Sequence, residues 1–557
     1  MATPFPRPQS KGFPIRSRLA GFLALLATCA GPAPAAGPTA ATGTVTGTVS
    51  NAVTRTALEG AAVGLGESGR TTLTDRSGRF TLEDVPAGAQ PVVITYTGLN
   101  PFRTTVAVAP GATANVTAEL RSDVYLLDAY TVTGEREGNA ASLTRQRNSA
   151  NLRNVAAMDA FGNMPNDNVG EILMRLPGVD GFQTNDDTTN LIAIRGIAPD
   201  LNTFSVDGVP QANANGFGRG LRTTGASGAL FDEIEVVKAL APENSADSIG
   251  GQVNMRSRSA FSQRERRRVS FRAQVRWVPP FVEAVPLRRP HPAHPLGNLT
   301  YSELLDAFGG ERNLGITTSL SYSQNVSAYW RTIQFYPTTD LNFPAPTTNY
   351  NTTNNLNHRF SAGATLKAEY KLSPSLQAWG SYLHSGISEP WQRNVITNAV
   401  ATAAAVDPAY SDTYTRIRRN AANRLTLGPQ LNSYRQSDDN AGAGLKYARG
   451  RWQAEVDTSV SASFARTNPS DAGDGARAGS VSVQMGDLGW EVDRTRSRID
   501  PEWRWIDGPS PYDPSSYTLS PTLTQNSVRR WANNVLTNLN ARYAPPTPFP
   551  SAIKAGA

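Results

Sequence analysis

Alternation of apolar and polar residues is the dominant pattern along most of the chain, and it predicts β-strands. Between residues 43 and 120 it recurs in about seven short runs, such as GTVTGTVSN and GRFTLEDVPAG, separated by Gly, Pro, Asp and Ser. Because side chains on a strand point alternately to its two faces, each run can bury one face. Seven such runs at this spacing are typical of a β-sandwich, which we place at residues 41–121.

A mixed pattern follows between residues 151 and 260. In the run NDNVGEILMRLPGV, four apolar residues share one face of a predicted helix, which Pro177-Gly178 ends. Short strand runs come next, with Ile192 and Ile194 on one face of the first and Phe204 and Val206 on one face of the second. The run FDEIEVVKAL predicts a further strand, so we expect a compact α/β domain. The helix face consists of Val169, Ile172, Leu173 and Leu176.

From residue 266 the alternating runs become longer, with apolar residues on one face, polar or charged residues on the other, and aromatics near the ends. Lipid outside and water inside a membrane β-barrel demand this pattern, whereas a soluble sandwich would rarely keep charges at every inward position. The connections between the runs also alternate between long and short, as in outer-membrane barrels. Strands are predicted near 269–278, 298–304, 314–323, 360–372, 376–385, 441–447, 452–464, 531–543 and 551–557.

These predictions define a mainly β chain whose residues 266–557 form about nine strands of an antiparallel transmembrane barrel. Barrel diameter grows with strand number, and nine strands are too few to surround a domain the size of residues 151–260. We therefore expect this part of the chain to be the N-terminal portion of a barrel, with the barrel incomplete.

The N-terminus has the features of an export signal. Lys11, Arg16 and Arg18 precede the apolar run LAGFLALLATCA, and APAAG offers a cleavage site after about Ala35. Residues 1–35 are therefore a predicted signal peptide. The single cysteine, Cys29, lies within it, so the exported chain is expected to have no disulfide; a lipoprotein signal is the alternative.

Composition and charge suggest no enzyme. The net charge of +7 is spread along the chain, and the basic run RERRR at 264–268 lacks the interleaved aromatics of a nucleic-acid site. His291 and His294 are separated by prolines and have no third ligand nearby, which argues against a metal site. We predict no catalytic residue, no metal, no cofactor and no nucleic-acid partner.

The sandwich segment resembles a known domain. Its motif order, G-A-x-V followed by T-D-x-x-G-x-F-x-L-x-x-V-P-x-G, is similar to that of the carboxypeptidase-regulatory-like domain, a transthyretin-like sandwich. The resemblance covers about 80 residues. It implies a non-catalytic module, related in fold to carbohydrate-binding sandwiches, without peptidase activity.

Residues 151–260 resemble the plug domain of TonB-dependent outer-membrane transporters. Five motifs carry this resemblance in order: LPGV, IRG, VDGV, IEVVK and IGGQVN. It implies a location in the outer membrane, contact with outer-membrane lipid, and partnership with TonB and its inner-membrane energising complex. It also implies that the arginine of the IRG motif, Arg195, with Gly196, docks the plug to the barrel wall. In this family the strand IEVVK is usually followed by glycine; here Ala239 follows, as in receptors for oligosaccharides.

The linker at residues 122–150 contains one extended apolar patch, VYLLDAYTVTGERE. A lone strand in a linker has unpaired backbone groups and can add to the sheet edge of a partner, although it could also be a last sandwich strand. The resemblance places the family's TonB box here, at Tyr130, Thr131, Val132, Thr133 and Gly134.

Two turn-rich plug segments, 181–190 and 211–228, follow elements that the family directs outward. Their amides and carboxylates suit the directional hydrogen bonds of a sugar, and an aromatic ring can stack on its apolar face. We therefore favour a small nutrient of the oligosaccharide class. A siderophore or other metal chelate is the alternative, as is a non-transporting glycan-binding protein. The predicted substrate-facing residues are Gln183, Asn185, Asp186, Asp187, Asn213, Asn215, Phe217, Arg219 and Arg222.

Overall fold

The computed structural model describes most of the chain from residue 42 to residue 557. The described ranges are 42–121, 137–149, 151–277, 293–337, 344–468, 481–520, 527–545 and 551–557, with breaks at 54, 67–69, 162–163, 165–167, 184–187, 215–219, 221, 242–243, 245–247, 264 and 401–404. The predicted signal peptide (1–35) and the predicted TonB box (130–134) lie outside the described residues.

The N-terminal sandwich has the seven strands that the alternation predicts. One sheet has the order β4-β1-β7 and the other β3-β2-β5-β6. The inward residues form one apolar core, in which Val45, Val63 and Ile94 are fully buried. The strands are β1 (Thr42–Asn51), β2 (Ala62–Leu65), β3 (Thr71–Leu73), β4 (Arg79–Pro86), β5 (Gly88–Tyr96), β6 (Leu99–Val108) and β7 (Thr113–Leu120).

Part of the predicted linker is a helix. Residues Glu137–Arg147 form α1, and Ala140 on this helix is buried in the sandwich core. The linker predicted over 122–150 thus includes a helix that the sequence pattern does not predict. The helix sequence, EGNAASLTRQR, has no apolar stripe, because its packing side chains are small, and periodicity therefore gives no signal.

The plug is a five-stranded sheet with the order β12-β11-β14-β13-β8, beside a hairpin of β9 and β10. Helix α2 packs Val169, Ile172 and Leu173 into the plug core, as predicted, although it is only five residues long. Its N-cap is Asn168, whose side chain accepts a hydrogen bond from the backbone of Gly170. The elements are β8 (Arg153–Ala157), α2 (Val169–Leu173), β9 (Val179–Gln183), β10 (Thr189–Ile194), β11 (Asn202–Val206), β12 (Val209–Pro210), β13 (Phe231–Val237) and β14 (Gly251–Ser257).

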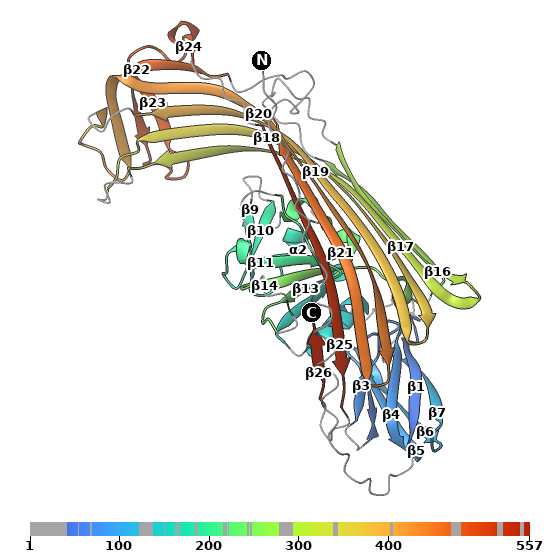
Figure 1. Ribbon diagram of the computed structural model, residues 1–557. Coiled ribbons are helices and arrows are strands. Elements are labelled where there is room, and N and C mark those ends of the chain that lie inside the picture. Colours follow the sequence, from blue (N-terminus) through green and yellow to red (C-terminus); the bar gives the residue numbers. More distant parts are fainter. Residues whose placement is uncertain are drawn as a thin grey trace, which may run out of the picture.

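The remaining strands form one antiparallel sheet of twelve strands, called the wall below, which curves around one side of the plug (Figure 1). All nine predicted strands are present. Three were missed, β22 to β24: β22 pairs with β20, and β23 and β24 each pair with β22. The wall strands are β15 (Arg267–Trp277), β16 (Ala293–Ala307), β17 (Gly310–Phe335), β18 (Asn349–Ser373), β19 (Leu376–Ala399), β20 (Tyr414–Arg449), β21 (Trp452–Thr467), β22 (Val483–Asp493), β23 (Glu502–Asp507), β24 (Thr518–Leu519), β25 (Val528–Tyr543) and β26 (Ile553–Gly556).

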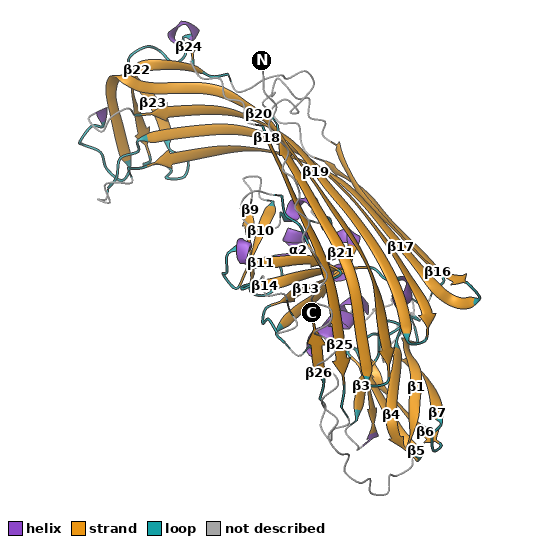
Figure 2. Ribbon diagram, viewed as in Figure 1, coloured by secondary structure: helices purple, strands orange, loops and turns teal. Residues whose placement is uncertain are grey.

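Several wall strands are much longer than predicted. β20 has 36 residues, and at about 3.3 Å per residue it extends far beyond a hydrocarbon layer of about 30 Å. The segments predicted as long loops, 324–359 and 386–440, are therefore mostly strand, and Figure 2 shows them running past the plug. Their residues, such as NYNTTNNLN at 349–357, are mostly polar on both faces with a few scattered apolar residues such as Tyr350, so alternation does not reveal them.

The two faces of the wall differ in character where the plug lies. On the outer face Phe271, Trp531 and Val535 are 80%, 72% and 73% exposed, whereas Ser319 and Ser461 on the inner face are buried. The described chain thus has the predicted fold class: a sandwich, a mixed plug and a largely antiparallel wall. Within these described residues, no helix is both long and apolar enough to cross a membrane.

Candidate functional site: the interface between plug and wall

Apolar contacts seat the plug on the inner face of the wall. Leu383 of β19 belongs to the same buried cluster as Ile192 and Phe204 of the plug. Opposite Leu230 of the plug, the wall has Gly363, where a Cβ atom would come within 2.6 Å of the leucine Cδ1. The wall thus completes the plug core, and glycine is required where the two surfaces approach most closely.

A buried ion pair lies at one end of this interface. Lys367 of β18 has its Nζ 3.2 Å from Oδ2 of Asp207 and donates to Ser257 at 3.0 Å. Both charged side chains are less than 10% exposed. Burial raises the pKa of Asp207, but the Lys367 ammonium and the Ser257 hydroxyl outweigh it and hold the pKa below its usual value. Asp207 therefore carries its charge inside the interface.

The turn of the VDGV motif presents this aspartate. Asp207 has a φ of +50° and Gly208 a φ of +85°, so the chain reverses sharply between β11 and β12. The Asp207 side chain also accepts a hydrogen bond from the backbone N–H of Ser257, at the end of β14. The motif that carries the family resemblance thus fixes a carboxylate against the wall.

A second polar cluster lies further along the interface. The guanidinium of Arg222 lies 4.3 Å from the centre of the Tyr434 ring on β20, and its Nη2 is 3.9 Å from a carboxylate oxygen of Glu389 on β19. Arg222 also donates from Nε to Asn190 at 2.9 Å, and Glu389 pairs with Arg359 of β18. This arginine therefore joins the plug to two wall strands by charge, hydrogen bonding and cation–π contact.

Two serines of the wall accept hydrogen bonds from the backbone of the plug. The N–H of Ala212 donates to Oγ of Ser461 at 2.6 Å, and the N–H of Ala214 donates to Oγ of Ser463 at 3.1 Å. Asn440 of β20 adds a hydrogen bond from Nδ2 to Oε1 of Gln211 at 2.9 Å. The plug segment 211–214 thus runs along β21 and is hydrogen-bonded to its serine side chains.

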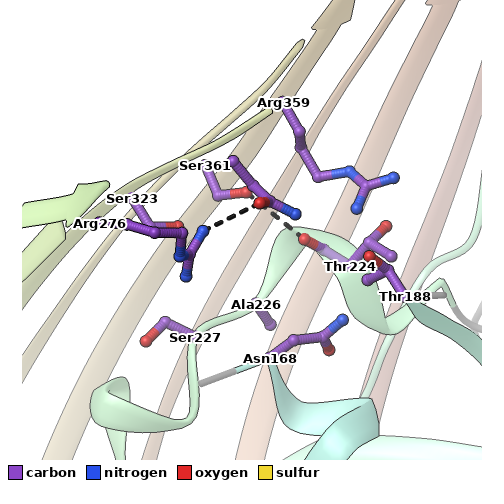
Figure 3. Close-up of a pocket in the computed structure, with 10 residues that line it drawn as sticks. Asn168, Thr188, Thr224, Ala226, Ser227, Arg276, Ser323, Arg359 and Ser361 are labelled. Atoms are coloured by element: carbon purple, nitrogen blue, oxygen red, sulfur yellow. Dashed lines mark hydrogen bonds between the residues drawn. The ribbon is translucent and has the colours of Figure 1, made fainter. Parts of the chain in front are cut away.

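A small polar cavity lies between these contacts (Figure 3). Arg359 of the wall points toward Thr188 and Thr224 of the plug, Arg276 donates to Asn325 of the wall at 3.0 Å, and Ser361 donates to the carbonyl of Thr224 at 3.4 Å. The cavity volume is about 30 Å³, room for about two ordered waters and far below the several hundred cubic ångströms of a nutrient pocket. It is a small gap in the interface and not a nutrient pocket.

The predicted site residues have different positions. Arg195 lies exposed at a plug turn with a φ of +54°, followed by Gly196 at +74°, and its guanidinium donates to the carbonyl of Gly250 within the plug at 3.3 Å. Its docking role stays a prediction, whereas Arg222, predicted to face substrate, contacts the wall. Asn213 donates to the carbonyl of Gly220 at 2.8 Å.

Most of the other predicted substrate-facing and TonB-box residues lie outside the described residues. Gln183 lies exposed at the end of β9. The rest fall outside the described residues: Asn185, Asp186, Asp187, Asn215, Phe217 and Arg219, with Tyr130, Thr131, Val132, Thr133 and Gly134 of the predicted TonB box.

Sequence reasoning missed most of the interface. Lys367, Glu389, Ser461 and Ser463 sit at inward positions of alternating strands, where they look like ordinary polar residues facing water. Asp207 was identified only as part of the VDGV motif. The available signal was Lys367, Glu369 and Glu389 at inward positions of strands predicted to cross a membrane, because buried charges there require partners.

Comparison with protein families gives two matches. The CarboxypepD_reg-like domain matches residues 45–132, and the TonB-dependent Receptor Plug Domain matches residues 145–252. No curated protein matches the chain.

Solved structures give more distant matches. The chain is similar to the unliganded ferric citrate transporter FecA (15% identity, TM-score 0.28), covering 74% of this chain and 63% of that one. It is also similar to the outer membrane transporter YddB from Escherichia coli (12% identity, TM-score 0.30), covering 70% of this chain and 61% of that one. A third similar structure is BauA, the ferric preacinetobactin receptor from Acinetobacter baumannii (12% identity, TM-score 0.33), with 73% of this chain and 60% of that one covered. The chain thus spans about three fifths of the length of these proteins.

Proposed function

We propose that this chain, which contains a CarboxypepD_reg-like domain followed by a TonB-dependent receptor plug domain, acts as a TonB-dependent receptor of the outer membrane for the uptake of a small nutrient. The observation that carries the proposal is the two-faced wall. Its inner face binds the plug through Lys367, Glu389 and Ser461, while its outer face exposes Phe271, Trp531 and Val535. Lipid on one side and a seated plug on the other account for both faces.

The proposed energy coupling uses the segment between the sandwich and the plug. Residues 130–134 follow β7 and precede α1, so a partner that adds a strand to them would pull on both domains. This supports TonB, with its inner-membrane energising complex, as the partner. A sandwich strand at this position is the competing interpretation, and it predicts no TonB binding.

The proposed nutrient is an oligosaccharide. Trp391 is two residues beyond Glu389 on β19, and therefore on the same inner face. Asn357 and Asn432 lie directly opposite it on the two neighbouring strands. An indole ring flanked by amides supplies the stacking surface and the directional hydrogen bonds that a sugar requires.

A metal chelate is the second candidate. The guanidinium of Arg393 lies 4.3 Å from the centre of the Trp391 ring, and Arg222 and Arg359 are close to Glu389. Several cations near one surface favour an anionic ligand. Ferric citrate therefore belongs in any binding test beside neutral oligosaccharides.

Cell fractionation tests the location. The receptor should appear in the outer membrane after loss of about 35 N-terminal residues, as the signal sequence indicates. Recovery in the inner membrane with residues 1–35 retained would contradict the proposal.

Calorimetry on the purified full-length receptor tests the ligand, with maltoheptaose, other neutral oligosaccharides and ferric citrate as probes. Trp391→Ala should weaken binding by at least about tenfold, or ~1.4 kcal/mol. Trp330→Ala, at an exposed position of β17 on the other face, is the matched control. Binding of ferric citrate alone would exclude the oligosaccharide class, and equal affinity of both variants would exclude this surface.

A further inference from the structure

The helix that replaces the expected linker is shared by two domains. On the sandwich side, Ala140 of α1 is buried in the sandwich core. Arg145 donates from Nη2 to Oε2 of Glu59 at 2.5 Å, and Asn148, just after the helix, donates to the carbonyl of Gly60 at 3.1 Å. The helix is therefore anchored to the sandwich by apolar, ionic and backbone contacts.

The same helix is anchored to the plug. The other guanidinium nitrogen of Arg145 pairs with Glu233 of β13, and Arg256 of β14 lies 3.3 Å from the same carboxylate. Gln146 accepts a hydrogen bond from the N–H of Val155 on β8 at 3.1 Å. Arg145 thus bridges one carboxylate in the sandwich and one in the plug.

The sandwich is also attached to the wall. Asp84 of β4 pairs with Arg451, in the short turn between β20 and β21, and Glu83 lies against Gly450 of the same turn. Figure 1 shows the sandwich at this end of the wall, next to the plug. The sandwich therefore contacts both α1 and the wall, α1 lies between the sandwich and the plug, and the plug also contacts the wall directly.

The electrostatics of the Arg145 cluster suit a contact that can open. Burial lowers the pKa of Arg145 to about 10, with Arg256 adding repulsion, so the guanidinium remains charged at neutral pH. Burial raises the pKa of Glu59, but Arg145, Arg256 and Arg76 outweigh it and lower the pKa overall. A buried charge cluster fixes geometry strongly but contributes little net stability, because its charges gain hydration when separated.

We propose that α1 and the sandwich form a clamp that holds the plug on the wall and opens when residues 130–134 are pulled. This inference rests on the proposed function, since TonB would supply the pull. The segment 130–134 ends three residues before α1 begins, so force passes directly into the helix. The sandwich resists through Asp84 and Arg451, and the Arg145 bridge is therefore the contact under tension.

Single-molecule pulling on the full-length receptor in a lipid bilayer tests the clamp. A biotin-acceptor peptide inserted after Gly134 provides the same handle in every variant. Arg145→Gln should lower the force of the first rupture and speed release by about 10- to 100-fold at fixed force, because Glu59 and Glu233 both lose their partner.

Arg153→Gln is the matched control. Arg153 pairs with Glu235 entirely within the plug, and both arginines are 21% exposed, so the same substitution removes a similar ion pair without touching the sandwich. Its first rupture should equal that of the unsubstituted receptor. Equal first ruptures for the Arg145 and Arg153 variants would overturn the proposal.

A reversible lock provides a test independent of folding defects. A Cβ atom on Gly60 would lie 3.3 Å from Cγ2 of Thr144, close enough for Gly60→Cys and Thr144→Cys to form a disulfide. The φ of +77° at Gly60 strains any side chain there, so the reduced form of the same double variant is the reference. The oxidised receptor should rupture at higher force than the same sample after reduction, and identical traces would overturn the clamp. Because the handle replaces TonB, a missing clamp is distinguishable from a failure to bind TonB or nutrient.

Discussion

The Nζ atom of Lys367, on a wall strand, lies 3.2 Å from the carboxylate of Asp207, on a plug turn, and both side chains are nearly fully buried. Removing the lysine charge in Lys367→Met leaves Asp207 buried without its cation. We expect a loss of about 3–5 kcal/mol in the stability of the seated plug. Hydrogen exchange of β11 and β14 in the detergent-solubilised receptor measures it.

The double variant Asp207→Asn with Lys367→Met is the control for this pair. Asparagine tolerates the positive φ of position 207, and no charge is then left alone. It should recover most of the lost protection. A double variant less stable than Lys367→Met would show that the pair does not act as a unit.

Acid should weaken the plug–wall interface. The pKa of Asp207 is lower in the folded protein than its ordinary value of about 3.9. Its contribution to stability is therefore complete above about pH 4 and is lost as the pH falls through the lowered pKa. Tryptophan fluorescence between pH 7 and pH 2 should show this loss, and Asp207→Asn should flatten that part of the profile. An unchanged profile would assign the acid sensitivity to other carboxylates.

Gly363 should tolerate no side chain while Leu230 stays in place. A methyl group there would come within 2.6 Å of the leucine, so Gly363→Ala is expected to cost about 1–3 kcal/mol. Gly98→Ala, at a sandwich turn with no atom within 4 Å of the added Cβ, separates crowding from a general effect of replacing glycine, although its φ of +82° adds local strain. Thermal unfolding of both variants gives the comparison. Rescue of Gly363→Ala by Leu230→Ala would establish the contact as the cause.

A proline in the predicted TonB box should abolish partner binding. Strand addition requires backbone N–H donors, and Val132→Pro removes one and bends the segment. Binding of the purified C-terminal domain of TonB to the full-length receptor, by surface plasmon resonance, is the measurement. Ser122→Pro, at the start of the same linker, should bind normally. Retained binding in Val132→Pro would argue against the box at residues 130–134.

The sequence predicted those parts of the fold in which burial is one-sided. The sandwich strands, the helix face of Val169 and Ile172, and the wall strands beside the plug all alternate or repeat in register with their buried faces. Helix α1 was not predicted because its alanine and serine side chains pack without forming an apolar stripe. The distal halves of β17 to β20 were not predicted because most of their residues are polar on both faces, and the few apolar ones in their small buried cluster, such as Tyr350, Ile417 and Leu425, are too scattered to alternate regularly.

The site was less predictable than the fold. Arg222 was predicted to face substrate, whereas its contacts with Tyr434 and Glu389 of the wall join residues more than 160 positions apart. Such pairs depend on how the plug is rotated against the wall, and a local pattern contains no information on that rotation. The partners of Asp207 and of the Ala212 backbone were hidden for the same reason.

The stretches of the long wall strands that are mostly polar on both faces determine where residues can be inserted or deleted. A one-residue insertion in a strand exchanges its two faces. Beside the plug, such an insertion in β18 would turn Lys367 and Glu369 toward the outer face and Leu366 inward. Among Asn351, Thr352 and Thr353 the same insertion swaps one hydrophilic residue for another and displaces only Tyr350, near the end of the strand, from a small apolar cluster. Insertions and deletions can therefore accumulate in the distal ends of these strands, while the register next to the plug stays fixed.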